Sequence, residues 1–339
     1  MKAEGGHVQK FLNRADDFVD EVLDGILAAH SDELKVAGHP RAIVTARAPI
    51  GNKVGIATGG GSGHLPLFLG YVGSGLADGC AIGNVFSSPS SEVMLEVTRA
   101  VSGGQGVLYL YGNYGGDCLN FDLAAEMAAD EGIHVQTIRA SDDIASAPPE
   151  EIHRRRGIAG IWFLYKIAGA RAAEGGSLDQ VVKVTTKAAA GLRSMGVALG
   201  PCIIPAAGRP TFEVPPGYME VGMGIHGEPG VRRDVLASAD DIAAELTDRL
   251  IKDLPFKRGN RVAVLVNGLG ATPMEELYLL YREARRRLVA AGIDIYRGWV
   301  GEYATSLEMA GASISLLRVD RELMRLLEAD AQAPLLRHV

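Results

Sequence analysis

Three glycine-rich stretches of the chain carry side chains that are suited to proton transfer or covalent catalysis. His64 lies in the sequence TGGGSGHLP, Asp117 in NYGGDCLNF and His226 in GMGIHGEPG. An imidazole can act as a nucleophile or exchange a proton near pH 7, and a carboxylate can accept a proton. Because glycine has no side chain, the backbone N–H groups around these residues are open to a ligand. The three stretches together suit a small polyhydroxylated ligand.

Each of these residues also has a simpler structural explanation. Asp117 could be the N-cap of a helix that follows it, and a single histidine usually has a structural role.

The sequence motifs of several other kinds of site are missing. The register from Gly59 puts His64 where the dinucleotide-binding pattern and the hydrolase elbow need glycine, and the chain has neither a phosphate-binding loop of the Walker type nor a zinc-binding HExxH pair.

The elements around these stretches alternate between two hydrophobic periods. Apolar residues at helical spacing predict an amphipathic helix over His7–His30, and Phe121–Glu131 has the same character. Short β-type runs predict strands at Val54–Ala57, Val107–Tyr111 and Val135–Ile138. This alternation is typical of an α/β sheet with crossover helices. Active sites in such sheets lie just past the ends of the strands, and Asp117 follows the end of one predicted strand.

The second half of the chain repeats this pattern. The spacing predicts two successive helices, Ile158–Glu174 and Leu178–Met195, the second with Ser177 as its N-cap. Further predicted elements are the strands Arg261–Val266 and Ser313–Val319 and the helix Glu275–Ala291.

Bulk composition excludes several classes of protein. A formal net charge of -7 argues against a nucleic-acid partner, and the runs Arg154–Arg156 and Arg285–Arg287 are interpreted as solvated helix faces. Three cysteines without metal-ligand or redox spacing indicate a reducing, cytoplasmic compartment and no metal site. No apolar stretch is long enough to predict a membrane span or an export signal.

The three stretches, with PCIIPAAG at 201–208, VNGLGATP at 266–273 and YATSL at 303–307, resemble the dihydroxyacetone kinase family over the whole chain. The similarity is to its ketose-binding DhaK subunit, a Dak1-type domain. This resemblance implies two α/β domains with mixed or parallel sheets and flanking helices, which share a crevice. We expect the N-terminal domain at residues 1–185 and the C-terminal domain at 186–339, with a boundary in the stretch 180–195.

The resemblance also implies a role for each site residue. His226 would attack the C2 carbonyl of a short ketose and hold it as a covalent hemiaminal, so a polyol such as glycerol would be rejected. Asp117 would accept the proton of the hydroxyl that is phosphorylated, and His64 would hydrogen-bond the sugar and assist proton transfer. Backbone amides of the 61–63 run (Gly61, Ser62 and Gly63) would hold the remaining oxygens.

Cofactor and partners follow from the same resemblance. No cofactor is expected on this chain. Because the sequence ends at Val339 without a nucleotide domain, ATP or ADP with Mg²⁺ would bind to a separate, DhaL-like subunit. A DhaM-like phosphotransferase protein could rephosphorylate that subunit. A homodimer is also expected.

Two residues depart from the family pattern. Leu65 stands where many relatives have Glu, and Gly112 stands where some have Lys. Loss of the Lys side chain would leave room for a larger ketose such as erythrulose or apulose, so dihydroxyacetone and a larger ketose are equally favoured. A ketose sensor that activates transcription is the other alternative. The retention of His64 and Asp117 favours the enzyme, because a sensor needs capture but not proton transfer.

Overall fold

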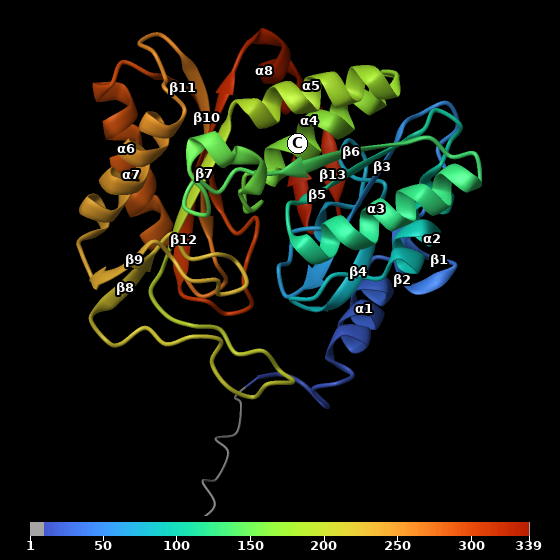
Figure 1. The fold of residues 1–339 in the computed structure, drawn as a ribbon, viewed down its shortest axis with the longest axis horizontal. Helices are drawn as coiled ribbons and strands as arrows, with labels where there is room; N and C mark the ends of the chain where they lie inside the picture. The colour runs from blue at the N-terminus through green and yellow to red at the C-terminus, as the bar shows by residue number, and fades with distance from the viewer. Residues whose placement is uncertain (1–9, 339) are drawn as a thin grey trace, which may run out of the picture.

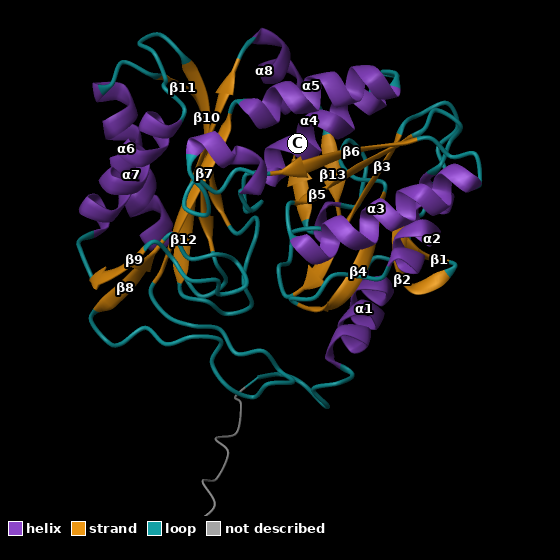
Figure 2. Ribbon diagram, viewed as in Figure 1, coloured by secondary structure: helices purple, strands orange, loops and turns teal. Residues whose placement is uncertain are grey.

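Two β-sheets with flanking helices make up the computed structural model, which describes residues 10–338 (Figures 1 and 2). The first sheet has the strand order β1-β2-β4-β3-β5-β6, and the second has the order β11-β10-β12-β7-β8-β9. Both are mixed: β3 is parallel to β4 and β5, and β10 is parallel to β11 but antiparallel to β12. The predicted two-part α/β architecture is therefore confirmed.

The strands have the following bounds. Those of the first sheet, in spatial order, are β1 Leu34–Ala37, β2 His39–Thr45, β4 Gly79–Val85, β3 Gly55–Ser62, β5 Val107–Gly112 and β6 Val135–Ala140. Those of the second sheet are β11 Asp294–Gly301, β10 Arg261–Gly268, β12 Gly311–Val319, β7 Leu192–Ala198, β8 Tyr218–Val221 and β9 Arg232–Val235. The strands β13 Ala331–Ala333 and β14 Leu336–His338 form a separate hairpin.

Helices cover both sheets. They are α1 Phe18–Ala29, α2 Ser91–Val101, α3 Gly115–Asp130, α4 Ile161–Ala173, α5 Leu178–Ala190, α6 Ala239–Asp253, α7 Met274–Ala290 and α8 Arg321–Glu328, with the 3-10 helices η1 Leu69–Tyr71 and η2 Pro149–Arg154. In Figure 1, α2 and α3 lie on the outer side of the first sheet and α6 and α7 on the outer side of the second. The helix α4 packs on β3 and β5, while α5 contacts strands of both sheets. No helix among residues 10–338 is long and apolar enough to cross a membrane.

One hydrophobic core joins the two sheets. It contains Leu110 of β5, Trp162 of α4, and Leu265 and Leu317 of the second sheet, all of them buried. The C-terminal hairpin returns to the first half of the chain, where Gln332 pairs with Ser74. The proposed division at 185/186 falls inside α5, and it stays a prediction.

Local sequence explains where the helices and strands begin. The predicted cap of α5 is confirmed, because the hydroxyl of Ser177 accepts from the backbone N–H of Gln180 and the Gln180 side chain accepts from the Ser177 N–H. In helices α2, α6 and α8 the side chain of the N-cap Ser or Asp also accepts from a backbone N–H of the first turn. The strand β5 is buried along its whole length, as expected for a parallel strand with helices on both faces.

The predicted helix over Leu178–Met195 is too long. In the structure α5 ends at Ala190, Gly191 follows, and Leu192 begins β7, which pairs with β12 in the second sheet. Its apolar residues fit both a buried helix and a buried strand, so periodicity alone could not separate them.

The predicted N-terminal helix over His7–His30 is also too long. Its first residues lie outside the described range, and the helix begins only at Phe18. Phe11, which the prediction put on the buried face, is fully exposed. Phe11 therefore has none of the tertiary packing that usually stabilises an amphipathic helix.

The glycine run after Ala57 extends the predicted strand Val54–Ala57. Strand β3 continues to Ser62, with Gly61 paired to Gly83 of β4. A Cβ at Gly61 would lie 2.6 Å from the backbone nitrogen of Ser87, and one at Gly60 would collide with the ring of Phe68. These glycines allow neighbouring backbone and an aromatic ring to approach the strand closely.

Candidate functional site

His226 lies in the loop between β8 and β9, next to residues from the first half of the chain. Its ring makes edge contacts with the rings of His64, Tyr114 and Phe86, at centroid distances of 4.7, 4.6 and 5.4 Å. The His226 side chain is 22% exposed, so a small ligand can reach it. The structure thus brings all three predicted stretches together, since Tyr114 belongs to the second.

Glu228 orients the His226 ring. Its carboxylate contacts Nδ1 of His226 at 2.9 Å and accepts from the His226 backbone N–H at 3.0 Å. Burial raises the pKa of Glu228, but the hydrogen bond and charge of His226 and the charge of Arg156 outweigh it and bring that pKa to about 2. An ionised carboxylate only accepts hydrogen bonds, so Nδ1 carries the proton. In the neutral ring Nε2 is then unprotonated and nucleophilic.

A second pair of charges holds Glu228. Arg156 lies 3.7 Å from the Glu228 carboxylate and bonds the Asp143 carboxylate at 2.8 and 3.0 Å. Asp143 is 1% exposed, so this pair has a fixed geometry. The result is a chain of alternating charges, Asp143–Arg156–Glu228, which ends on the His226 imidazole.

The sequence pattern had predicted a solvated helix face for the run Arg154–Arg156. The structure contradicts this prediction. Arg155 is completely buried and makes a bidentate pair with Asp253, at 2.6 and 2.7 Å. Buried arginine is stable only with such a partner, which lies far away in sequence. The other predicted run, Arg285–Arg287, does lie on the surface of α7.

His64 is buried beside His226. Its Nδ1 lies 2.8 Å from the backbone carbonyl oxygen of Thr305 and must donate to it, whereas its Nε2 has no hydrogen-bond partner. Burial, followed by the charge of His226, lowers the pKa of His64 to about 3. The ring is thus neutral near pH 7, and Nε2 is an acceptor.

Asp117 lies in the first turn of α3 and is not its N-cap. The cap position is Tyr114, so the capping explanation is wrong, and Asp117 is instead a buried residue whose Oδ1 has no partner. Burial raises the pKa of Asp117 to about 6, partly offset by a hydrogen bond with Ser88 and the charge of His226. This carboxylate is ionised at pH 7 and can accept a proton.

Hydrogen bonds between the two halves of the chain position His64. The backbone N–H of Leu307 donates to the carbonyl of Gly63 at 2.7 Å, and the N–H of Thr305 donates to that of His64 at 3.2 Å. The Thr305 hydroxyl also donates to the carbonyl of Leu65 at 3.0 Å. We call these contacts the 63–65/305–307 seam.

Asn267 supports the seam from β10. Its side-chain oxygen accepts from the N–H groups of Tyr303 and Ala304, at 2.7 and 2.9 Å, and its amide donates to the carbonyl of Ala304 at 2.9 Å. Two of the sequence motifs, 266–273 and 303–307, therefore serve to place the segment that holds His64.

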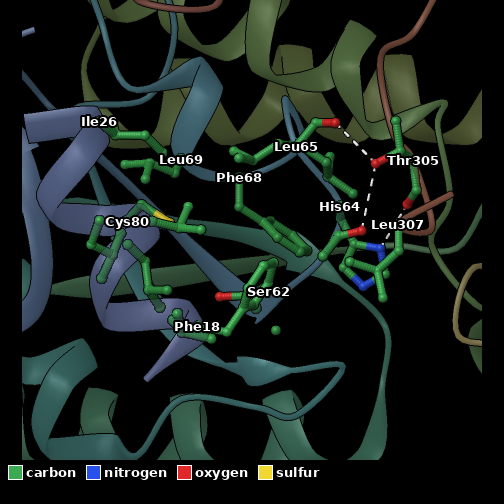
Figure 3. Close-up of a pocket in the computed structure, with 18 residues that line it drawn as sticks. Phe18, Ile26, Ser62, His64, Leu65, Phe68, Leu69, Cys80, Thr305 and Leu307 are labelled. Atoms are coloured by element: carbon green, nitrogen blue, oxygen red, sulfur yellow. Dashed lines mark hydrogen bonds between the residues drawn. The ribbon is translucent and has the colours of Figure 1, made fainter. Parts of the chain in front are cut away.

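A cavity of about 220 Å³ lies on the side of His64 that faces α1 (Figure 3). The predicted ligand-binding run Gly61–Gly63 lines it, as does Leu65. The hydroxyl of Ser62 already donates to the carbonyl of Gly83 at 2.8 Å. That the backbone amides of Gly61, Ser62 and Gly63 bind substrate stays a prediction.

Gly112 does not leave open space, contrary to the sequence-based expectation. A Cβ at this position would lie 3.0 Å from the ring of Tyr114, which itself touches His226. The space next to the Cα of Gly112 is therefore bounded by this aromatic ring.

Several residues of the site were not predicted. Glu228 stands two residues after His226 in the quoted motif, so the spacing of histidine and carboxylate was a usable signal. Phe86, Tyr114 and Thr305 act through contacts between distant segments, which no local pattern reveals. Within residues 10–338, no three His, Cys, Asp or Glu side chains are grouped as metal ligands would be.

Comparisons with known proteins agree on one family. The model of the Dak1 domain matches residues 24–335. The chain is 44% identical to the dihydroxyacetone-binding subunit DhaK of the PTS-dependent dihydroxyacetone kinase 2 from Listeria innocua, over 96% of this chain and 98% of that protein. It is 43% identical to a D-erythrulose kinase from Mycolicibacterium smegmatis, of which it spans only 56%.

A solved structure has the same fold. The dihydroxyacetone kinase operon co-activator Dha-DhaQ superposes with a TM-score of 0.87 at 33% identity, over 94% of this chain and 99% of that one. The matches extend across both sheets and include the three stretches that carry His64, Asp117 and His226. The chain therefore belongs to the Dak1 domain family, as a member of the DhaK type.

Proposed function

We propose that this chain is the ketose-binding subunit of a dihydroxyacetone-type kinase, a phosphotransferase that acts on an alcohol group. The observation that carries the proposal is the pairing of His226 with Glu228, which leaves Nε2 of the neutral ring unprotonated beside two further polar groups, His64 and Asp117. The 44% identity to a DhaK subunit over nearly its whole length supports it.

Capture of the ketose is a nucleophilic addition. The lone pair of Nε2 of His226 attacks the C2 carbonyl carbon, the carbonyl π electrons move to oxygen, and that oxygen takes a proton from solvent, so that a C–N bond replaces the C=O π bond and a hemiaminal results. The ring becomes positively charged until its Nδ1 proton is lost, and the Glu228 carboxylate stabilises this charge at 2.9 Å. A polyol without a carbonyl cannot react.

Transfer of the phosphoryl group needs a base. As the terminal hydroxyl of the bound ketose attacks the terminal phosphorus of the ATP on the partner, its proton passes to the buried carboxylate of Asp117, the bond from that phosphorus to the bridging oxygen breaks, and ADP leaves. Nε2 of His64 accepts a hydrogen bond from the sugar and helps to position it. Because the ketose is tethered, part of the entropic cost of aligning hydroxyl and phosphoryl donor is met in advance.

The phosphoryl donor is supplied by a partner. We propose a DhaL-like subunit that carries ATP, or ADP rephosphorylated through a DhaM-like phosphotransferase protein, with Mg²⁺. The name of the Listeria innocua relative, a subunit of a PTS-dependent kinase, supports this assignment. A homodimer of this chain is part of the proposal and rests on the family resemblance.

The preferred ketose is dihydroxyacetone or a four-carbon or branched analogue. Similar identities to a dihydroxyacetone-binding subunit and to an erythrulose kinase, 44% and 43%, keep both in the proposal. Apulose belongs to the same chemical class.

Intact-protein mass spectrometry under native conditions tests the proposal. The protein is incubated with dihydroxyacetone, erythrulose, apulose or glycerol, with the His226→Ala variant as a control. We expect an adduct of one ketose mass that is absent in the variant and absent with glycerol. No adduct with any ketose would refute the role of His226.

A second candidate function is that of a ketose sensor. The likeness to the co-activator Dha-DhaQ favours it, whereas the buried Asp117 and His64 favour the enzyme. Phosphorylation of the ketose in the presence of a DhaL-like subunit separates the two, because a sensor would form the adduct without turnover.

A further inference from the structure

Gly224, in the stretch that carries His226, is buried against two charged side chains. A Cβ at this position would lie 2.1 Å from Oε2 of Glu228 and 2.5 Å from Nη1 of Arg156, closer than the 3.0 Å that real Cβ atoms keep. The backbone N–H of Gly224 already donates to the carbonyl of Glu228 at 3.1 Å, so it is not free to bind a ligand. The missing side chain at Gly224 therefore makes room for a carboxylate and a guanidinium.

Arg156 links two carboxylates that come from different halves of the chain. Its Nε and Nη2 donate to one oxygen of Asp143, at 3.0 and 2.8 Å, and its Nη1 lies 3.7 Å from Oε2 of Glu228. Its Nη2 also lies 3.3 Å from the carbonyl oxygen of Gly222. A guanidinium, with five donors in one rigid plane, suits these separated acceptors, whereas the compact ammonium of lysine cannot span them. The Arg156 side chain is 15% exposed, so it has little freedom to turn away.

The Glu228 oxygen that faces Arg156 also holds the backbone of His226. Oε2 accepts from the His226 N–H at 3.0 Å, while Oε1 contacts Nδ1 of the ring at 2.9 Å. The two oxygens belong to one rigid planar group, so a displacement of Oε2 must also move Oε1 relative to Nδ1. Arg156 therefore acts on the His226 ring through Glu228.

The residue after Arg156 supports His226 from a second side. The hydroxyl of Tyr114 donates to the carbonyl of Gly157 at 3.0 Å, and the Tyr114 ring packs against the His226 ring at a centroid distance of 4.6 Å. The segment 156–157, from the first half of the chain, is thus in contact with two of the side chains that flank this imidazole.

We propose that Arg156 and Gly224 are positioning residues for ketose capture. Arg156 holds the Glu228 carboxylate against Nδ1 of His226, and Gly224 leaves the space in which the two charged groups meet. The neutral ring then carries its proton on Nδ1 and offers an unprotonated Nε2 to the carbonyl. The role in capture rests on the proposed function, whereas the effect on the ring does not.

Two substitutions remove this positioning and leave every charge in place. Arg156→Lys keeps the cation but loses the planar group that reaches both carboxylates. Gly224→Ala displaces the ends of two flexible side chains, and Gly224 lacks the left-handed backbone that favours glycine, so the chain can still fold. The matched controls are Arg154→Lys, in an exposed pair two residues earlier, and Gly25→Ala on α1, where a Cβ would meet nothing within 4 Å.

Nitrogen-15 NMR of the histidine rings tests the positioning in the absence of any ketose. At about pH 8.5, where an ordinary imidazole is neutral, the ring shifts distinguish a protonated nitrogen from an unprotonated one. We expect His226 to be protonated on Nδ1 in the wild type and in both controls, and Arg156→Lys and Gly224→Ala each to gain a population protonated on Nε2. Circular dichroism checks the fold, and if one variant is unfolded the other decides. Wild-type ring shifts in the folded variants would overturn the proposal.

A dihydroxyacetone titration followed by native mass spectrometry then tests the role in capture. Both variants should raise the dissociation constant of the adduct about tenfold, the lower end of what residues that orient a metal ligand contribute, and the controls should not. A wild-type dissociation constant in a variant whose tautomer has changed would refute the role in capture. If the wild type itself forms no adduct, the proposed function fails, while the ring shifts still decide whether Arg156 and Gly224 position His226.

Discussion

Replacing Glu228 by Gln removes one negative charge from the site while preserving the shape of the side chain. The amide oxygen of Gln can still accept from Nδ1–H of His226, so the ring keeps its tautomer, but the amide nitrogen cannot accept from the His226 backbone N–H as the second carboxylate oxygen does. In the proposed capture, the substitution also removes the stabilisation of the positive ring that forms when Nε2 adds to a carbonyl. We therefore expect Glu228→Gln to weaken ketose capture without unfolding the protein.

The magnitude follows from the pKa of Glu228. The difference between its ordinary value of 4.5 and about 2 corresponds to about 3 kcal/mol, at 1.36 kcal/mol for each pKa unit. Arg156 contributes part of this, and the Glu228 side chain is 30% exposed, so solvent screens another part. We assign about 1.4 kcal/mol to the pair with His226, which is about tenfold in the dissociation constant of the adduct.

Calorimetry with dihydroxyacetone, or native mass spectrometry across a ketose titration, measures this change. Glu275→Gln, an exposed carboxylate on α7, is the matched control and should bind as the wild type does. Glu228→Asp retains the charge and should recover part of the affinity. If Glu228→Gln captures ketose as tightly as the wild type while His226→Ala does not, the charge on Glu228 has no role in capture.

Three further predictions concern buried charges. Burial raises the pKa of Asp117 from 3.8 to about 6, so its protonated form stabilises the fold below pH 3.8 and that stabilisation is lost as pH rises through 6. Asp117→Asn should therefore raise the free energy of unfolding by up to about 3 kcal/mol at pH 8 and by little at pH 4. Denaturant unfolding at the two pH values measures this change, and equal increases at both would contradict the prediction. Phosphoryl transfer should fall tenfold per pH unit below about 6, because protonated Asp117 cannot accept a proton; a flat profile from pH 7 to 5 would exclude it as the base. Asp253→Asn should lower the free energy of unfolding by about 3 to 5 kcal/mol, because it leaves buried Arg155 without a carboxylate. The control Asp248→Asn removes an exposed pair and should lower the free energy of unfolding by less than about 1 kcal/mol.

Much of the site was predictable because glycine-rich motifs mark strand ends. His64 and His226 are adjacent, as the family resemblance implied, and Asp117 follows β5. The roles of these residues stay predictions, because geometry alone does not report a reaction. Glu228 stands two residues after His226 in the quoted motif, and this spacing is a signal that the sequence reasoning did not use.

The errors in secondary structure have a common cause. The end of α5 and the extent of β3 depend on pairing with strands far away in sequence, β12 and β4. The burial of Arg155 likewise depends on Asp253, about a hundred residues later. Local periodicity reports which side chains are apolar, but tertiary contacts decide whether a short segment becomes strand or helix.

The 63–65/305–307 seam has a consequence for the way this family can diversify. Its hydrogen bonds join carbonyls from one half of the chain to N–H and hydroxyl groups from the other, and His226 also comes from that second half. A hybrid gene that takes residues before α5 from one relative and residues after it from another exchanges the two sides of one pocket independently. Substrate preference should therefore be inherited with the matched pair of halves, and hybrids between relatives with different ketoses should lose activity more readily than they acquire a new specificity.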